Sequence, residues 1–462
     1  MPPPPCGRGA CLVLIAALQV ISSTEYTDAE RGSYVNPDSE RPGGLVGQAG
    51  KMSEEQSQRG GVEVTLKYSY ANKTLFNYAA ESRGYPEEPD RVFVTCRGGG
   101  MTVIDISTGG ESESAPDIIA RWDVPWTVEG QDRMGELLVV SELGRGPDGA
   151  LERGPHLHLF RLPEDGNYGG LLSPFASMNL TSRIDAILHV KLYQHTGGDL
   201  WALCTGGFAT SAQGAVVAVN LTGAAAGLSY FENGGDGNDD SSSSREDIFV
   251  LETNVTQPEG IMIVGDFAYI GGISSKALAV VALAEPNPSH MHIVTMLYLE
   301  NGVMMCFIWS GAQLVATSWP KEPFGMGPAD ILYMADWRDV GGLAVVNVSD
   351  PKAPILLSSV RSLRAAKANR VKLLRLRPES SSSDKEVQVA LLPLEQPIGA
   401  LAVVDVTDPA EARLLAVRHL PLHLRDWTST KTYCLAVNQR AEVHVFTALT
   451  STVYVFQISL AR

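Results

Sequence analysis

The chain has 462 residues, of which 44% are hydrophobic, and its 36 basic and 52 acidic side chains give a formal charge of −16 at pH 7. This acidic surface, without any block of basic residues, argues against nucleic acid and anionic membrane surfaces as partners. The apolar content is sufficient for a large core, so the chain forms either several domains or one repeat array.

A largely apolar run near the N-terminus predicts a secretory signal peptide. The run extends from Ala10 to Ile21 and is followed by the small residues Ser22 and Ser23. About twelve residues are too few to cross a bilayer but suit the hydrophobic region of a signal. We therefore expect residues 1–23 to be removed and the mature chain to be secreted or held at the cell surface, without membrane insertion. An uncleaved anchor is the alternative.

The next segment, residues 24–61, is rich in Gly, Ser, Glu and Gln and has little to bury, which predicts a disordered leader. Residues 62–68, from Val62 to Tyr68, then alternate apolar and polar side chains. That alternation is typical of a half-exposed strand.

A buried-strand pattern recurs through the rest of the chain. Its clearest copies enter from Gly342 and Gly399 and stop at Asp350-Pro351 and Asp408-Pro409, and the seven copies begin at positions 101, 157, 216, 278, 343, 401 and 453. Such spacing is that of four-stranded propeller blades with decorated loops. The sequence therefore predicts an all-β fold, a seven-bladed β-propeller of four-stranded antiparallel blades spanning residues 62–462.

The last unit has only three strands before the chain stops at Arg462. An open blade edge would expose unpaired backbone groups. We expect the strand from Val62 to Tyr68 to complete this blade by pairing with residues 453–458, which closes the ring between the two ends of the chain.

The signature strands resemble the LVIVD-type repeat. The resemblance is carried by residues 343–350 with Pro351, by residues 401–408 with Pro409, and by preceding strands such as 266–272. It implies an exported or cell-surface β-propeller in a family without one assigned activity, and it provides no catalytic residues. Function must therefore be sought in loops and sites rather than in the fold.

In blade five, residues 304–309 and 313–317 are the expected first and second strands. Two long connections between the expected second and third strands, 142–155 in blade two and 318–340 in blade five, suggest a recognition face. They mix aromatic and charged side chains, as binding surfaces do: Trp319, Phe324, Tyr333, Asp336, Trp337, Arg338, Asp339, Glu142, Arg145 and Arg153. We predict a monomeric, non-catalytic binding or scaffold module for a protein or glycan partner. Alternatively, the blade-five insert plugs the ring.

A second hypothesis is an extracellular hydrolase or oxidoreductase with its site at the central opening. The sequence contains no Gly-x-Ser-x-Gly, His-Glu-x-x-His or phosphate-binding Gly-x-x-x-x-Gly-Lys motif. A cluster of Asp, Glu or His from three or more innermost strands would favour the enzyme. An opening lined by Val, Ala and Met would favour binding.

No cofactor is predicted, although two patterns faintly suggest metal. One echoes a calcium loop but has Ser241 where the sharp turn needs glycine: Asp236, Asn238, Asp240 and Asp247. We expect a solvated loop there. The other consists of alternating histidine pairs that lack a third ligand: His156 with His158 and His290 with His292.

Four cysteines follow the signal, at positions 96, 204, 306 and 434. We expect buried free thiols, and only Cys96 with Cys434 lie in blades close enough for a disulfide. Among the Asn-x-Ser/Thr sequences, Asn72, Asn179 and Asn254 are the expected glycosylation sites. Asn220 and Asn347 end signature strands, where we expect turns capped by the asparagine side chain.

Overall fold

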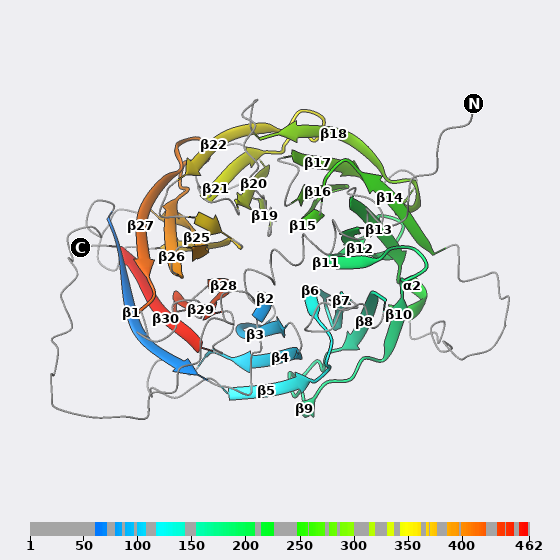
Figure 1. The fold of residues 1–462 in the computed structure, drawn as a ribbon, viewed down its shortest axis with the longest axis horizontal. Helices are drawn as coiled ribbons and strands as arrows, with labels where there is room; N and C mark the ends of the chain where they lie inside the picture. Colours follow the sequence, from blue (N-terminus) through cyan, green and yellow to red (C-terminus); the bar gives the residue numbers. More distant parts are fainter. Residues whose placement is uncertain are drawn as a thin grey trace, which may run out of the picture.

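The computed structural model describes the chain from residue 61 onward with gaps. The described residues are 61–71, 79–85, 88–96, 99–107, 117–143, 154–207, 214–225, 247–256, 258–272, 277–283, 287–299, 314–318, 330–336, 342–361, 366–368, 370–376, 386–396, 399–421, 432–438, 440–447 and 452–460. Seven sheets of these residues stand in a ring around a central axis (Figure 1). The predicted seven-bladed propeller is therefore confirmed. The expected signal and leader, up to residue 60, lie outside the described residues.

The first four blades follow the chain from the axis outward. Blade one contains β2 (Ala79–Tyr85), β3 (Glu88–Cys96), β4 (Gly100–Asp105), β5 (Asp117–Trp122) and the short parallel strand β9 (Gly170–Leu171). Blade two contains β6 (Val128–Met134), β7 (Leu137–Glu142), β8 (His156–Arg161) and β10 (Ala176–Asn179). Blade three contains β11 (Ala186–Gln194), β12 (Leu200–Gly207), β13 (Gly214–Asn220) and β14 (Ile248–Thr253). Blade four contains β15 (Pro258–Val264), β16 (Phe267–Gly272), β17 (Ala277–Ala282) and β18 (His292–Tyr298).

The other three blades repeat this order. Blade five contains β19 (Leu314–Ser318), β20 (Asp330–Ala335), β21 (Gly342–Asn347) and β22 (Ile355–Arg361). Blade six has an interrupted innermost strand, β23 (Ala366–Ala368) and β24 (Lys372–Leu376), followed by β25 (Val387–Gln396), β26 (Ala400–Asp405) and β27 (Arg413–His419). Blade seven contains β28 (Thr432–Val437), β29 (Glu442–Thr447), β30 (Thr452–Leu460) and β1 (Val62–Ala71). The helical elements among the described residues are single turns, α2 (Thr222–Ala225), Pro288–His290 and Pro409–Glu411, and no described helix is long and apolar enough to span a membrane.

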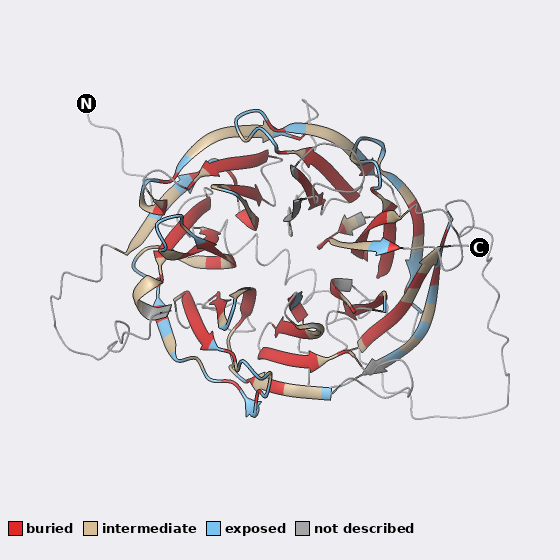
Figure 2. Cartoon of the chain, turned by 180° about the vertical axis from the view of Figure 1, so that it is seen from behind, coloured by how far each residue is buried: buried red, intermediate tan, exposed pale blue. Residues whose placement is uncertain are grey.

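The hydrophobic core is divided into seven clusters, one between each pair of neighbouring blades. Each predicted signature strand is the third strand of its blade, and it is buried on both faces. In β21, for example, Val345 packs toward blade six and Val346 toward blade four. Both faces of these strands must therefore be apolar, which explains their uninterrupted runs of apolar residues. The outermost strands are more exposed (Figure 2).

Glycines precede the signature strands because the next strand's backbone lies too close for a side chain. A Cβ on Gly100 would lie 1.9 Å from the carbonyl oxygen of Trp122, and one on Gly342 would lie 2.0 Å from that of Val360. Gly100 also has a φ of +76°, in the left-handed region that favours glycine. The glycine that precedes the signature strand in the sequence is therefore required by packing.

The signature strands end in turns capped by a side chain, as predicted for Asn220 and Asn347. In each turn the side-chain oxygen accepts a hydrogen bond from the amide two residues later. The distances are 2.8 Å for Asp105 to Ser107, 3.0 Å for Asn220 to Thr222, 2.9 Å for Asn347 to Ser349 and 3.0 Å for Asp405 to Thr407. Asparagine and aspartate are interchangeable here because either oxygen serves as the acceptor.

Blade seven closes the ring as predicted. Strand β1 pairs antiparallel with β30, from Val62 opposite Leu460 to Ala71 opposite Thr452, with a register shift near Leu66. Val62 and Val64 are buried in the cluster between blades six and seven. The N-terminal and C-terminal strands of the propeller are therefore held to each other by one strand pair and by the apolar face of that pair.

The strand order predicted for blade five was wrong. Residues 313–317 were expected to form the second strand, but Leu314–Ser318 is the innermost strand, and β20 lies inside the segment interpreted as a long loop. Residues 304–309, expected as the first strand, lie outside the described residues. The run Ile331-Leu332-Tyr333-Met334 is apolar enough to predict a strand. It was missed because residues 313–317 had been assigned as the second strand of this blade.

The described cysteines are buried free thiols, as expected. Cys96 and Cys434 lie in one cluster, between blades one and seven, and Cys204 lies between blades two and three. Burial raises the pKa of the Cys96 thiol, and the neighbouring Cys434 raises it further. Cys306 lies outside the described residues.

Ring closure is tested by charging the buried face of β1. In a Val64→Asp variant the carboxylate enters the apolar cluster, so we expect the free energy of unfolding to fall by about 3 kcal/mol or more. Thr65→Asp, on the exposed face of the same strand, should change it by less than about 0.5 kcal/mol. Chemical denaturation of both variants measures the difference, and equal losses would contradict the closure.

The second prediction concerns the buried His444 on β29. Burial lowers its pKa from 6.5 to about 4, although the negative charge of Glu442 opposes the shift. Between these pH values the unfolded chain binds a proton that the folded chain does not, so the free energy of unfolding must fall as pH falls. The loss attributable to His444 approaches roughly 3 kcal/mol near pH 4.

A His444→Gln variant removes this titration. Denaturation of wild type and variant at about pH 7 and about pH 4.5 should give a smaller pH-dependent loss for the variant. Parallel losses would show that His444 does not link folding to pH.

Candidate functional site

Several innermost strands each have a bulge near their first residues, so these bulges lie on the same face of the ring. The pairing register breaks after Ala79 in β2, after Val128 in β6, after Ile187 in β11 and after Pro258 in β15. In blade six the break separates β23 from β24. A bulge redirects side chains that regular pairing would alternate between the two faces, and bulges are frequent beside active sites.

The bulges carry ionisable side chains that are buried. Glu129, His189 and Glu259 occupy the bulges of β6, β11 and β15, with exposed fractions of 2%, 6% and 7%. Arg370, between β23 and β24, is only 1% exposed. We call these four residues the bulge cluster. Charged groups are seldom buried so completely without a partner or a function.

Arg370 connects three blades across the axis. Its Nη2 donates to the carbonyl oxygen of Ala80 in blade one at 3.1 Å and lies 3.3 Å from Nε2 of His189 in blade three. Because a guanidinium only donates, Nε2 of His189 must accept, and in the neutral imidazole the proton is then on Nδ1. The contact therefore places a neutral imidazole beside a permanent positive charge.

Hydroxyl groups from the second strands hold the bulges in place. Ser141 on β7 accepts from the amide of Gly130 at 2.8 Å and donates to the carbonyl oxygen of Leu188 at 2.8 Å. Thr95 on β3 likewise donates to the carbonyl oxygen of Glu129 at 2.6 Å. Each hydroxyl thus fixes the bulge of the following blade.

Thr205 occupies the corresponding position in blade three. It lies on β12 opposite the bulge of β11 and is completely buried. Among the described residues its Oγ1 has no hydrogen-bond partner. A buried hydroxyl without a partner requires an explanation, such as a bound water or ligand.

Further polar side chains continue along the innermost strands. Arg83 on β2 donates to the carbonyl oxygen of Gln131 at 2.8 Å and also pairs with Asp132 on β6. Lys191 on β11 contacts the same carboxylate at 3.2 Å. Blades one, two and three are thus joined by an ion network, and the axis is not lined by Val, Ala and Met alone.

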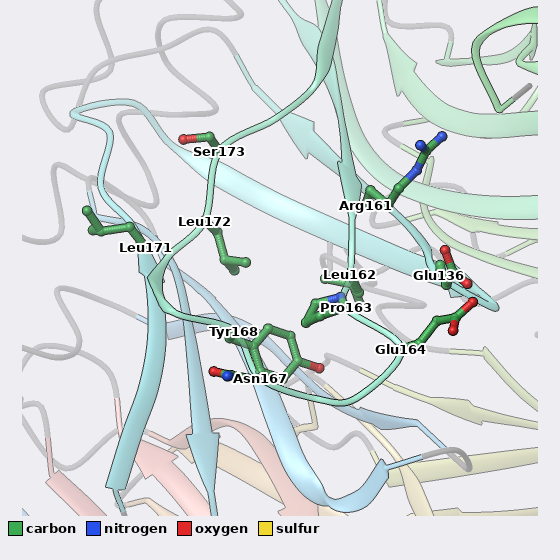
Figure 3. Close-up of a pocket in the computed structure, with 10 residues that line it drawn as sticks. All are labelled: Glu136, Arg161, Leu162, Pro163, Glu164, Asn167, Tyr168, Leu171, Leu172 and Ser173. Carbon is green, nitrogen blue, oxygen red and sulfur yellow. The ribbon is translucent and has the colours of Figure 1, made fainter. Parts of the chain in front are cut away.

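An open pocket lies on the outer rim between blades one and two, lined by Tyr168, Leu171 and Leu172 together with Glu136 and Glu164 (Figure 3). The pKa of Glu164 is raised because it shares a hydrogen bond with Glu136 and is repelled by its charge. This pocket was not predicted from the sequence. Apart from Glu136, its lining residues lie between Arg161 and Ser173 and follow no recognised motif.

The predicted recognition residues are only partly described. Glu142 ends β7 and is 0% exposed, and Tyr333 lies in β20 and is also 0% exposed. Placing these two residues on loops was therefore wrong. Asp336 follows β20 and is buried. The residues outside the described part of the chain are Trp319, Phe324, Trp337, Arg338, Asp339, Arg145 and Arg153, and their recognition role stays a prediction.

The metal candidates are not gathered into a site in the described part of the chain, where no three His, Cys, Asp or Glu residues could hold an ion. His156 and His158 stack on each other with ring centroids 6.0 Å apart, and His290 and His292 lie around the start of β18. Of the calcium candidates, Asp247 is half-buried before β14, whereas Asp236, Asn238 and Asp240 lie outside the described residues.

The expected glycosylation sites divide in the same way. Asn179 and Asn254 are exposed, and Asn72 lies outside the described residues. Their modification stays a prediction.

Comparison with known proteins supports the repeat and the fold. Residues 330–362 match the family model of the LVIVD repeat. This match covers β20, β21 and β22 and confirms the resemblance. No curated protein matches the chain.

Solved structures resemble the chain in fold alone. A periplasmic gluconolactonase of Pseudomonas aeruginosa matches with a TM-score of 0.50 and 12% identity, covering 74% of this chain and 85% of that one. The WD40 β-propeller domain of Doa1 matches with a TM-score of 0.47 and 8% identity, covering 85% of this chain and 97% of that one.

The contact between neighbouring bulges gives a third prediction. A Cβ on Gly130 would lie 2.6 Å from Cα of His189 and 2.8 Å from the carbonyl oxygen of Leu188. Gly130→Ala should therefore cost roughly 1–3 kcal/mol of the free energy of unfolding. Gly99→Ala is the control, because its Cβ would make only a 3.4 Å contact with Cβ of Cys96. Equal stabilities of the two variants in chemical denaturation would show that the bulges do not touch.

Proposed function

We propose that this protein is an exported enzyme that binds a small polar substrate at the bulged end of its central axis. The observation that carries the proposal is the bulge cluster, in which Glu129, His189 and Glu259 are buried on three innermost strands and His189 lies 3.3 Å from Arg370. Buried acidic and histidine side chains on three innermost strands support the enzyme hypothesis over a purely binding module. The N-terminal apolar run and the exposed Asn179 support export.

The residue types suit acid–base chemistry. A carboxylate or a neutral imidazole accepts a proton from a bound substrate, and a guanidinium stabilises negative charge that develops on it. In this proposal His189, which lies beside Arg370, is the base, and Glu129 and Glu259 orient the polar groups of the substrate. The hydroxyl of Thr205 supplies an additional hydrogen bond. The substrate is proposed to be small, because the side chains of the bulge cluster are buried on the innermost strands.

A binding role for the loops is a second candidate. The mixture of aromatic and charged residues around Trp319 and Trp337 favours recognition of a protein or glycan. This role does not exclude chemistry at the axis, because the two use different residues.

The fourth prediction separates function from structure in the bulge cluster. Functional sites often retain buried charges at a cost in stability. A Glu129→Gln, Glu259→Gln double variant keeps the shape of both side chains but removes their charge, so the melting temperature should stay the same or rise. A fall of several degrees would show that the carboxylates serve only to hold the ring together.

Activity is measured with this double variant and with a His189→Gln variant. Purified wild type is assayed for proton release from a panel of small polar lactones that carry no apolar group. Sugar lactones are included because a gluconolactonase shares the fold. We expect turnover by wild type and its loss in the double variant and in His189→Gln. Equal turnover by all three proteins would contradict a site at the axis.

A further inference from the structure

A line of hydrogen bonds crosses three neighbouring strands of blade two, away from the bulge cluster. Nε2 of His158 on β8 lies 2.6 Å from Oε2 of Glu142 on β7, and Nδ1 of the same ring lies 2.8 Å from Oγ of Ser177 on β10. Glu142 and His158 are 0% and 3% exposed, whereas Ser177 is exposed. The line therefore runs from a buried carboxylate to a hydroxyl at the surface.

The direction of these hydrogen bonds follows from the groups themselves. An ionised carboxylate only accepts, so the neutral imidazole of His158 places its hydrogen on Nε2 and leaves Nδ1 as an acceptor. The hydroxyl of Ser177 then donates to Nδ1. In acyl transfer, serine is activated when it is hydrogen-bonded to a base and that base is oriented by a third group. The present arrangement has the same three parts.

The surrounding strands hold the imidazole in one orientation. Ser177 stands directly opposite His158 in the pairing of β10 with β8. On the blade-one side, the ring of Trp122 packs on His158 with centroids 4.7 Å apart. His156 stacks on it from the same strand. The base is therefore fixed before a substrate arrives.

We propose that Ser177 is the nucleophile of an esterase site, with His158 as its general base and Glu142 as a positioning residue. The substrates are carboxylic esters that carry an apolar group. Phe175 lies just before β10, where its backbone amide donates to the carbonyl oxygen of Leu159 at 2.9 Å. Phe175 stands two residues before Ser177 in the sequence and is 41% exposed, so it offers an apolar side chain to the substrate.

In the first step, Oγ of Ser177 bonds to the ester carbonyl carbon while Nδ1 of His158 takes the hydroxyl proton. The carbon–oxygen bond to the alcohol then breaks, and His158 passes the proton to the departing oxygen. In the second step, water attacks the acyl-serine and gives its proton to His158, which returns it to Ser177 as the carboxylic acid leaves. The sequence consumes one water and needs no other reactant.

The test uses a fluorophosphonate probe, which phosphonylates activated serines with loss of fluoride. We expect wild type to form an adduct on Ser177, located by peptide mass spectrometry, and to hydrolyse p-nitrophenyl butyrate. Ser177→Ala should lose both activities, whereas Ser173→Ala, an exposed serine on the same segment, should keep both. No adduct on Ser177, or equal ester hydrolysis by wild type and Ser177→Ala, would overturn the proposal.

The roles of the other two residues have separate readouts. His158→Ala should slow labelling by about 100-fold, the contribution of a general base, and added imidazole should restore part of the rate. Glu142→Gln keeps an acceptor for Nε2 but removes the charge, so labelling should slow by about tenfold while unfolding remains cooperative. Wild-type labelling rates in both variants would show that the hydrogen bonds serve only to join the strands.

Discussion

The pairing of β1 with β30 is the contact on which the rest of the propeller depends. Each blade buries its two faces against its neighbours, so the blades are stable only as a closed ring. Without β1, blade seven would end in the open edge of β30, and the cluster that contains Val62 and Val64 would lose one wall. Closure also determines where the innermost strands stand around the axis.

Closure also brings side chains together at the axis, because those of non-neighbouring blades meet only inside a complete ring. Arg370 of blade six reaches Ala80 of blade one and His189 of blade three. Ser141 and Gly130 fix the bulges of blades two and three to each other. The bulge cluster is therefore a property of the assembled ring rather than of any single blade. The line from Glu142 to Ser177, by contrast, is built within blade two.

The architecture could be predicted from the sequence, but the candidate sites could not. Blade number and closure follow from local patterns, namely the repeated apolar strands and the alternation from Val62 to Tyr68. The bulge cluster depends on breaks in register, which leave little trace beyond the similar pairs Glu129-Gly130 and Glu259-Gly260. Glu142, His158 and Ser177 come from three strands and meet only through pairing. Tyr333 was wrongly assigned to a loop because residues 313–317, earlier in the chain, had been interpreted as the second strand of blade five.

Hydrogen exchange followed by mass spectrometry on the intact protein tests the closed ring most directly. If closure holds the propeller together, amides of β1 should be protected as strongly as those of β29 and β30, and all three should exchange through the same global opening. Exchange of β1 that is orders of magnitude faster, while β29 and β30 remain protected, would contradict the account, because the ring would then persist without its closing strand.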